Sequence, residues 1–444
     1  MASVKSTIRK MVPEPVMSIY HFFIAYFAAV RYKFPSKKMV MIGITGTKGK
    51  TSTANFIWSC LTANSYKVGL IGTANIRIGQ SEMLNQFHMT MPGPSSLQKI
   101  ISQMADEGCK YCVMEVTSEG IKQFRHMGII FDFAVLTNLT PEHLAAHGSF
   151  DKYREAKGKL FAGLKKGFVK TINGRKLSKT IILNNDCPEK DYFQQFDADA
   201  KITYGIKKKA DFNAKDIKDT SSGVMFSVKD VPYKLNILGD FNIYNALPAI
   251  IIANELGVLK NRIQKGLYEL SLIPGRMEKI VEGQNYTLIV DYAHEKESMS
   301  AVLNTAKNMS KDSKGRIIVL LGAEGGGRDK VKRPLMGKLA GKLADYVIVS
   351  NVDPYEDDPT EIVEDIAVAC EREGKVRGKD LFIIEDRRKG INKALSLAKR
   401  DDIVLITGKG AEQSIVINGK RSDWDDRRVV REELRKILRK KIKT

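Results

Sequence analysis

The feature that most constrains the fold is the stretch IGITGTKGKTSTANF at residues 42–56. A strand-like apolar run ends at Gly46, and a segment compatible with a helix begins at Lys50. Gly46 and Gly49 allow a tight turn, so that backbone N–H groups and a helix N-terminus can face an anion. A strand, a glycine-rich turn and a helix in this order predict a phosphate-binding loop in an α/β fold.

The side chains of this loop fit a nucleotide triphosphate. Lys50 is expected to reach the outer phosphates, and Thr51 or Ser52 to offer a hydroxyl group to Mg²⁺. The two glycines lie closer together than in the general phosphate-loop pattern. The loop is therefore a tighter variant of that pattern.

Apolar runs that alternate with helix-period stretches extend this prediction to the rest of the chain. Strands are expected at residues 39–45, 111–116, 133–137, 180–184, 316–321, 346–350, 381–384 and 403–407. Such alternation predicts parallel sheets with ligands at the carboxyl ends of the strands. The sequence IPGR at residues 273–276 is the expected hinge. We expect an N-terminal helical segment at 1–38, a central phosphate-loop ATPase domain at 39–272 and a C-terminal Rossmann-like α/β domain at 273–444.

The net charge of +21 over 444 residues indicates anionic partners. Lysines and arginines are interleaved with acids, and no RNA-binding motif accompanies them, so nucleic acid is not expected as a partner. A phosphorylated substrate or an anionic lipid surface fits better. The five cysteines form no disulfide or zinc pattern, which favours a reducing, cytoplasmic location.

The N-terminal run VMSIYHFFIAYFAAV, at residues 16–30, is shorter than the roughly 20 residues that span a bilayer. It lacks a small-residue cleavage site, which argues against a signal peptide. Basic residues follow it at Arg31, Lys33, Lys37 and Lys38. Two interpretations stay open, namely a helix in the membrane interface, giving peripheral membrane contact, and a helix packed on the next domain.

The loop sequence GTKGKTS resembles the ATP loop of the Mur ligases, the ATP-dependent amide-forming enzymes of peptidoglycan synthesis. Folylpolyglutamate synthases and cyanophycin synthetases share this loop. Further blocks resemble the MurE branch and follow in its order from residue 39 onward: MEVTSEGIKQFR, TNLTPEHLAAHGSFDKYREAKGKLF, LGDFNIYNALPAI, IPGRME, VDYAHEKESM, GGGRDKVKRPLM and GKGAEQ.

The resemblance implies an ATP- and Mg²⁺-dependent ligase that adds an amino acid to a muramyl-peptide-type carboxylate through an acyl phosphate. Two anions must meet in this reaction, so cations are expected to carry much of the catalysis. The implied catalytic residues are Lys50, Glu115, His143 and Lys157, and the implied metal ligands are Thr51, Glu115, His143 and a carbamylated Lys157. The implied nucleotide contacts are Gly46, Thr47, Lys48, Gly49, Lys50, Thr51, Ser52, Asn138, Asn242, Arg276 and Asp291. The implied substrate contacts are Thr90, Ser118, Arg125, Arg328, Asp353 and Glu412.

The chain departs from the MurE pattern at several places. Only some forty residues precede the loop, so we expect the usual N-terminal UDP-binding domain to be missing. Tyr355 follows Asp353-Pro354 where diaminopimelate enzymes have an arginine, which weakens diaminopimelate as the added amine. Asp353, Glu356 and Asp357 favour a cationic amino acid such as lysine, or are solvated loop charges. The GKGHE motif has Ala411 in place of histidine, and the SSH motif has become Thr-Ser-Glu at residues 117–119.

Two other functions stay open at this point. One is a polyglutamate- or cyanophycin-like ligase with another acceptor, against which the VDYAHE and GGGRDK blocks argue. The other is a non-catalytic, membrane-associated, nucleotide-binding scaffold, which would not need Glu115, His143 and Lys157. The sequence leaves open the amine, the choice between a UDP-linked and a lipid-linked acceptor, and the oligomeric state.

Overall fold

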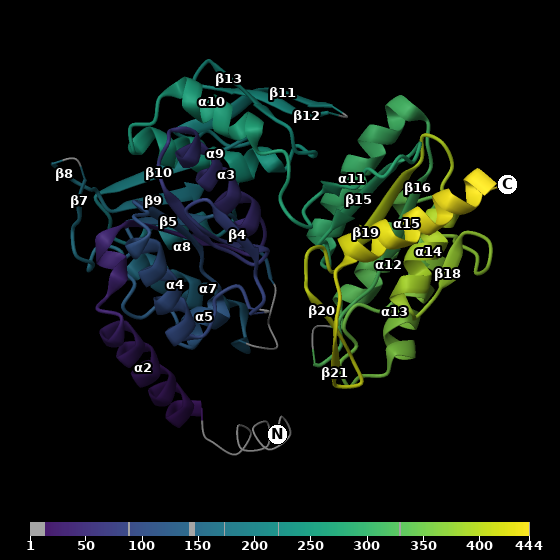
Figure 1. The fold of residues 1–444 in the computed structure, drawn as a ribbon, viewed down its shortest axis with the longest axis horizontal. Helices are drawn as coiled ribbons and strands as arrows, with labels where there is room; N and C mark the ends of the chain where they lie inside the picture. The colour runs from purple at the N-terminus through teal and green to yellow at the C-terminus, as the bar shows by residue number, and fades with distance from the viewer. Residues whose placement is uncertain are drawn as a thin grey trace.

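The computed structural model describes residues 14–87, 89–141, 147–172, 174–220, 222–327 and 330–443. Figure 1 shows two α/β lobes, with the labelled elements through α10 in one lobe and those from β15 onward in the other. This agrees with the predicted fold class. The predicted domain boundary at residues 272/273 stays a prediction; helix α10 (Lys260–Glu269) ends before it and strand β14 (Glu278–Lys279) follows it.

The first lobe is built on one sheet in the order β13-β12-β11-β10-β9-β6-β1-β5-β2-β3-β4. Its parallel centre consists of β1 (Val40–Thr45), β2 (Val68–Ile71), β5 (Tyr111–Glu115), β6 (Phe133–Leu136), β9 (Thr180–Asn184) and β10 (Ala200–Gly205). The outer strands are β3 (Asn75–Ile78), β4 (Ser81–Leu84), β11 (Phe212–Thr220), β12 (Gly223–Val228) and β13 (Val231–Leu235). The predicted strands of this lobe are confirmed to within one residue at each end.

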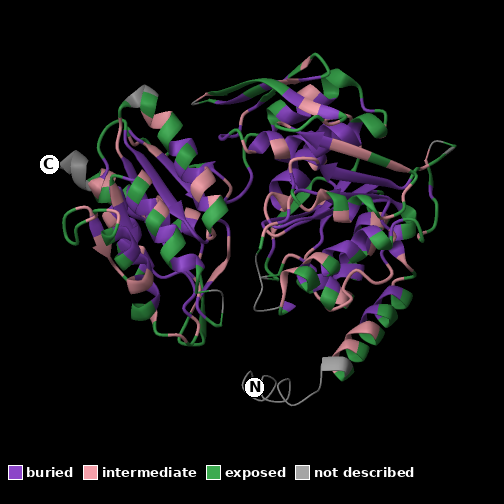
Figure 2. Ribbon diagram, turned by 180° about the vertical axis from the view of Figure 1, so that it is seen from behind, coloured by how far each residue is buried: buried purple, intermediate pink, exposed green. Residues whose placement is uncertain are grey.

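Helices cover both faces of this sheet, which explains why β1 is buried along its whole length. Ile42 and Ile44 face α3 (Lys50–Ala63), α9 (Asn242–Glu255) and α10. Met41 faces the opposite core. The helices on that side are α4 (Pro94–Asp106), α5 (Ser118–Lys122), α7 (Phe150–Ala162) and α8 (Lys190–Gln194). Figure 2 shows the buried residues concentrated in the strands of both lobes.

The second lobe holds a six-stranded sheet in the order β14-β15-β19-β16-β17-β18. The strands after β14 are β15 (Thr287–Asp291), β16 (Ile317–Leu321), β17 (Tyr346–Val349), β18 (Leu381–Ile383) and β19 (Ile403–Thr407), all parallel. One face packs on α11 (Lys296–Ser313), α12 (Lys332–Leu343) and α13 (Pro359–Glu371), and the other on α14 (Arg387–Leu397) and α15 (Asp426–Lys443).

The remaining elements lie outside these two sheets. They are α2 (Glu14–Arg31), the 3₁₀ helix η1 (Pro35–Lys38), and the hairpins β7 (Thr171–Ile172) with β8 (Arg175–Lys176) and β20 (Ser414–Ile417) with β21 (Lys420–Asp423). Helix α2 extends away from the first lobe at its lower side in Figure 1. None of the helices in the described ranges has the length and apolarity needed to cross a membrane.

Candidate active site

The phosphate loop, residues 46–50, joins β1 to α3 as the sequence predicts. Gly46 has a φ of 146° and Gly49 a φ of 84°, and both lie in the region that favours glycine. A Cβ atom on Gly46 would overlap Thr137 Oγ1, and one on Gly49 would overlap Asn245 Oδ1. The loop therefore requires glycine at both positions, for backbone conformation and for space.

The segment that follows β6 holds the phosphate loop from outside. The Thr47 N–H donates to the Asn138 backbone oxygen over 2.9 Å, and the Lys48 N–H donates to Asn138 Oδ1 over 2.9 Å. Thr137 Oγ1 donates to the Lys48 carbonyl over 2.6 Å. The Asn138 side chain thus supports the backbone of the loop, while its predicted nucleotide contact stays a prediction.

Two lysines from different helices converge on one oxygen of the loop. Lys50 Nζ donates to the carbonyl groups of Gly46 and Thr47, each over 2.9 Å. Lys157, on α7, is 2% exposed and donates from Nζ to the same Gly46 carbonyl over 2.9 Å. Two ammonium groups brought so close together favour the binding of an anion.

Glu115 ends the central strand β5 and is fully buried. Its carboxylate accepts hydrogen bonds from Thr73 N–H over 2.7 Å and from Thr73 Oγ1 over 3.0 Å. Thr73 Oγ1 lies 2.9 Å from Thr90 Oγ1, so the structure links two predicted site residues through a third. Sequence reasoning missed Thr73, because no motif marks it.

A carboxylate such as Glu115 and the hydroxyl of Thr51 are hard oxygen ligands suited to Mg²⁺. Within the described ranges, no three His, Cys, Asp or Glu residues gather closely enough to hold a metal ion. His143, a predicted ligand, lies outside those ranges. Glu115 and Thr51 thus have the ligand chemistry that Mg²⁺ prefers, and their predicted role as metal ligands stays a prediction.

Ser118 and Arg125, the predicted substrate contacts that follow β5, are held by neighbouring groups. Ser118 Oγ lies 3.1 Å from His147 Nε2. Burial lowers the pKa of His147, and Lys122 and Lys157 add to this effect against Glu119. His147 was missed, although it is the second histidine of the block HLAAHG.

Arg125 contacts its own segment and the segment that precedes α4. Its guanidinium group donates to the Met91 carbonyl and to Gln123 Oε1, the latter over 2.6 Å from Nη2. Its predicted role in holding a substrate stays a prediction.

The second lobe reaches the loop through Arg276. Its Nη2 lies 3.4 Å from Thr51 Oγ1, and its guanidinium group stacks 4.1 Å from the centre of the Tyr292 ring. This contact connects the predicted hinge to the first turn of α3. The predicted contact of Arg276 with the nucleotide stays a prediction.

Two other predicted nucleotide contacts are part of internal networks. Asp291 accepts from the N–H groups of Met277 and Ala293, each over 2.7 Å, and its pKa is raised by burial. Asn242 donates to the Leu238 carbonyl over 2.7 Å and accepts from Asn245, the residue that packs on Gly49.

The loop after β19, residues 408–412, contains a lysine that sequence reasoning missed. Lys409 is fully buried, and its Nζ donates to Asp353 Oδ2 and Glu412 Oε2, each over 2.8 Å. Burial opposes its charge, but Glu412 and Asp353 outweigh burial and raise its pKa to about 12. Tyr292 also donates to Glu412 over 2.9 Å.

This pairing bears on the selection of the amino acid. Asp353 is already paired with Lys409 and accepts from the Val416 N–H over 2.8 Å. The predicted contact of Asp353 with a cationic amino acid stays a prediction, and in the structure Lys409 already pairs with this carboxylate. Arg328, another predicted substrate contact, lies outside the described ranges.

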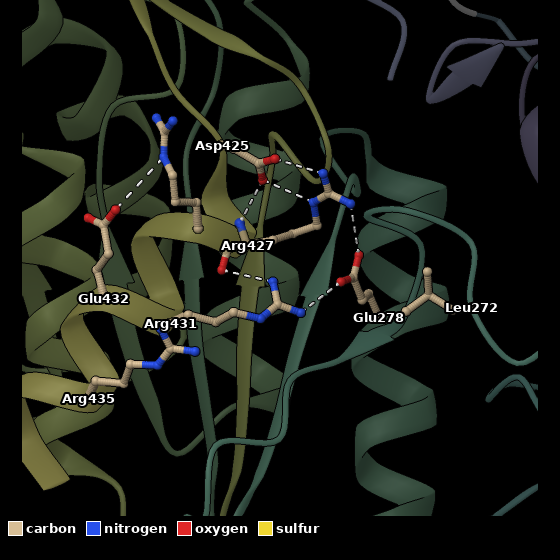
Figure 3. A pocket seen from close by; sticks show the side chains of 8 residues that line it. Leu272, Glu278, Asp425, Arg427, Arg431, Glu432 and Arg435 are labelled. Carbon is tan, nitrogen blue, oxygen red and sulfur yellow. Dashed lines mark hydrogen bonds and ion pairs between the residues drawn. The ribbon is translucent and has the colours of Figure 1, made fainter. Parts of the chain in front are cut away.

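A separate cavity of about 520 Å³ lies beside the hinge on the second lobe. Figure 3 shows that the Glu278 carboxylate faces Arg427 and Arg431. The shortest distances between the charged atoms are 3.5 Å to Arg427 and 3.3 Å to Arg431. Glu278 also accepts from the Gly275 N–H over 2.9 Å. None of the residues that line this cavity belongs to the phosphate loop.

Comparison with known proteins agrees with this arrangement. Two family models match the chain: "Mur ligase middle domain" over residues 44–253 and "Mur ligase, glutamate ligase domain" over residues 275–410. The UDP-N-acetylmuramoyl-L-alanyl-D-glutamate–2,6-diaminopimelate ligase of Bacillus cereus is 36% identical over 429 residues, which cover 95% of this chain and 84% of that protein. The UDP-N-acetylmuramyl-tripeptide synthetase of Roseiflexus sp. is 34% identical over 439 residues, which cover 96% and 85%.

Solved structures show the same fold. A UDP-N-acetylmuramoyl-L-alanyl-D-glutamate–2,6-diaminopimelate ligase matches with a TM-score of 0.59 and 28% identity, over 90% of this chain and 79% of that one. The sequence identity, the coverage and the phosphate loop with its paired lysines lead to one conclusion. The chain belongs to the Mur ligase family of ATP-dependent, ADP-forming amide ligases.

Proposed function

We propose that this protein joins an amino acid to the carboxylate of a muramyl-peptide acceptor in the synthesis of peptidoglycan precursors, and that ATP drives the reaction. The observation that carries the proposal is the glycine turn between β1 and α3, which holds Lys50 Nζ at the carbonyl groups of Gly46 and Thr47 in a loop shaped for phosphate. The names of the relatives support a UDP-linked muramyl dipeptide as the acceptor.

The proposed reaction has two steps. The acceptor carboxylate attacks the γ-phosphorus of ATP, so that an acyl phosphate forms and ADP leaves. The neutral amine then attacks the acyl carbon, the C–N bond of the amide forms, and the bond between the acyl carbon and the phosphate oxygen breaks. The amine loses one proton, and phosphate leaves with that proton as HPO₄²⁻. Lys50 offsets the charge on the outer phosphates during the first step.

Mg²⁺ would neutralise phosphate charge in this reaction, held by Thr51, Glu115, His143 and a carbamylated Lys157. The burial of Glu115 and of Lys157 supports this assignment. Carbamylation would convert the Lys157 ammonium group into an anion and remove one of the two positive charges now beside Gly46. Arg276, which reaches Thr51 from the second lobe, would close the site over the nucleotide and exclude water from the acyl phosphate.

The added amino acid calls for a direct test. The Bacillus cereus relative is named for diaminopimelate. In this chain, Tyr355 stands where an arginine would grip the distal carboxylate, and its ring lies against Gly326. Its φ of 55° fixes this loop in an unusual conformation. A neutral ring at this position supports an added amino acid that, unlike diaminopimelate, has no distal carboxylate.

The test is phosphate release from ATP and Mg²⁺ with UDP-muramoyl-dipeptide and a panel of amino acids that includes diaminopimelate and lysine. We expect release that depends on both the acceptor and one amino acid, with the corresponding gain in product mass. Release without an acceptor, or no product with any member of the panel while ATP binds, contradicts the proposal.

In this proposal the enzyme works in the cytoplasm, where ATP is supplied, and contacts the membrane peripherally through residues 16–30. The exposed apolar side chains of this segment support that contact.

A further inference from the structure

The outer face of helix α2 is apolar and exposed. Eight large side chains on it are between 37% and 64% exposed: Val16, Ile19, Tyr20, Phe23, Ile24, Tyr26, Phe27 and Val30. No aspartate, glutamate, lysine or arginine occurs from residue 16 to residue 30. Contiguous apolar surface of this kind marks an interaction site.

The inner face of α2 carries the smaller side chains. Ala25, Ala28 and Ala29 are buried. Ala29 lies so close to Gly128 that a Cβ atom there would overlap it, and the Phe22 ring meets Phe124 edge-on at 5.6 Å. A helix that only covers a domain places its large apolar residues inward and its charges outward. In α2 most of the large apolar residues face outward, and residues 16–30 carry no charged side chain on either face.

Helix α15 shows the usual order within the same chain. Both helices have 18 residues. Helix α15 buries Val430 and Leu434 completely and exposes the basic residues Arg428, Arg435, Lys436 and Arg439. The outward-facing apolar side chains are therefore a property of α2, and α15, a helix of the same length, does not share it.

A cluster of basic side chains lies at the C-terminal end of this apolar face. Arg31, Lys33, Lys37 and Lys38 are all exposed, at the end of α2 and in η1. Basic residues next to an exposed apolar helix face are complementary to a surface that has anionic groups above hydrocarbon. The net charge of +21 adds a long-range attraction to the same surface.

We propose that the outer face of α2 docks this enzyme on an anionic lipid bilayer. The helix lies in the plane of the interface, because its uncharged apolar run, residues 16–30, is shorter than the roughly 20 residues that span a bilayer. Its aromatic and aliphatic side chains enter the acyl boundary, and the four basic residues bind the headgroup phosphates. The first lobe then stays on the aqueous side.

The test is co-sedimentation of the full chain with vesicles of phosphatidylglycerol and phosphatidylcholine, without ATP or other substrates. We expect binding to the mixed vesicles and at least tenfold weaker binding to pure phosphatidylcholine. Phe23→Glu with Phe27→Glu should weaken binding to the mixed vesicles at least tenfold. Both rings are exposed by half or more, so these substitutions should leave the thermal unfolding temperature unchanged.

The matched control places the same two glutamates on another surface. Val281 and Val376 are 80% and 52% exposed, and Val281→Glu with Val376→Glu should bind vesicles like the parent chain. Equal binding by both double variants, or no binding by the parent chain, overturns the proposal.

The alternative partner for the outer face of α2 is a second copy of the chain. A lipid-free dimer that Phe23→Glu with Phe27→Glu dissociates, together with no vesicle binding, would overturn the proposal in favour of self-association. Vesicle binding is measured without turnover, so loss of ligase activity alone would bear only on the proposed function.

Discussion

The two lobes each carry a glycine loop with a lysine after a buried strand, and the two loops treat that lysine differently. The phosphate loop follows Ile-Thr at the end of β1, and residues 408–412 follow Ile-Thr at the end of β19. Gly46 and Gly49 have positive φ angles, as do Gly408 and Gly410. The backbone solution is therefore shared.

The partners of the lysines differ. Lys50 donates to backbone carbonyl groups and shares one of them with Lys157, whereas Lys409 donates to two carboxylates. The first arrangement gathers positive charge for an anion, and the second completes an internal ion-pair network. A glycine loop with a lysine does not by itself define a phosphate site. Whether the lysine can bind an anion depends on the charges of the residues that surround it.

Replacing the phosphate-loop lysine should have the largest effect. We expect Lys50→Ala to lower ATP-dependent product formation by about a thousandfold, because charge stabilisation in such a site supplies several kcal/mol. The measurement is steady-state phosphate release, with circular dichroism as the check on folding. Lys67→Ala, which removes an exposed ion pair with Glu107, is the control and should keep full activity. Equal activity of Lys50→Ala and the parent chain would contradict the role of Lys50 in binding phosphate, and with it the difference drawn between the two loops.

Replacing the other lysine should act on stability first. Lys409→Met leaves Asp353 and Glu412 without their buried partner, which should lower the free energy of unfolding by about 3–5 kcal/mol. Urea unfolding measures this loss. Adding Asp353→Asn and Glu412→Gln should restore part of it, because the stranded charges are then gone. No recovery in the triple variant would show that the network does not act through charge.

Arg276 contacts Thr51 at the phosphate loop and Tyr292, which donates to Glu412 in the loop at residues 408–412. Its removal should lower catalysis less than Lys50→Ala does. We expect Arg276→Ala to lower kcat/KM for ATP by about 10- to 100-fold, as expected for one hydrogen bond to a charged group. Arg435→Ala, which removes an ion pair with Glu282, should change kcat/KM much less. If the two variants are alike, Arg276 has no part in closing the site.

The smallest effects concern how the free energy of unfolding depends on pH, which should differ between a histidine of the first lobe and a lysine of the second. Burial lowers the pKa of His126 to about 4, below the value near 6.5 in an unfolded chain. Its contribution to stability is complete above pH 6.5 and is lost as the pH falls, by about 2 kcal/mol at pH 5. The pKa of Lys409 is raised, so the pH dependence runs the other way. Its contribution to stability is complete below pH 10.5 and is lost as the pH rises through 12.

Urea unfolding from pH 5 to pH 11 tests this difference. His126→Gln should flatten only the acid side of the stability profile, and Lys409→Met only the alkaline side. A change on both sides for either variant would contradict the assignment.

The sequence predicted the strands and the phosphate loop, because they rest on local apolar runs and on glycine spacing. It missed Thr73, His147 and Lys409, whose positions depend on residues distant in the chain, such as Glu115, Ser118 and Asp353. It also left open how α2 is oriented. Periodicity identifies the residues of a helix, but only packing shows that its alanines face inward.

The ion pairs around Glu278 have a mechanical consequence for lobe movement. Glu278 binds the Gly275 backbone on one side and Arg427 and Arg431 of α15 on the other. The chain from residue 275 onward is thus fastened to the last helix of the second lobe. We expect the pivot to lie before this point, between α10 and Gly275, so that the second lobe swings as one rigid piece and carries Arg276 toward or away from Thr51.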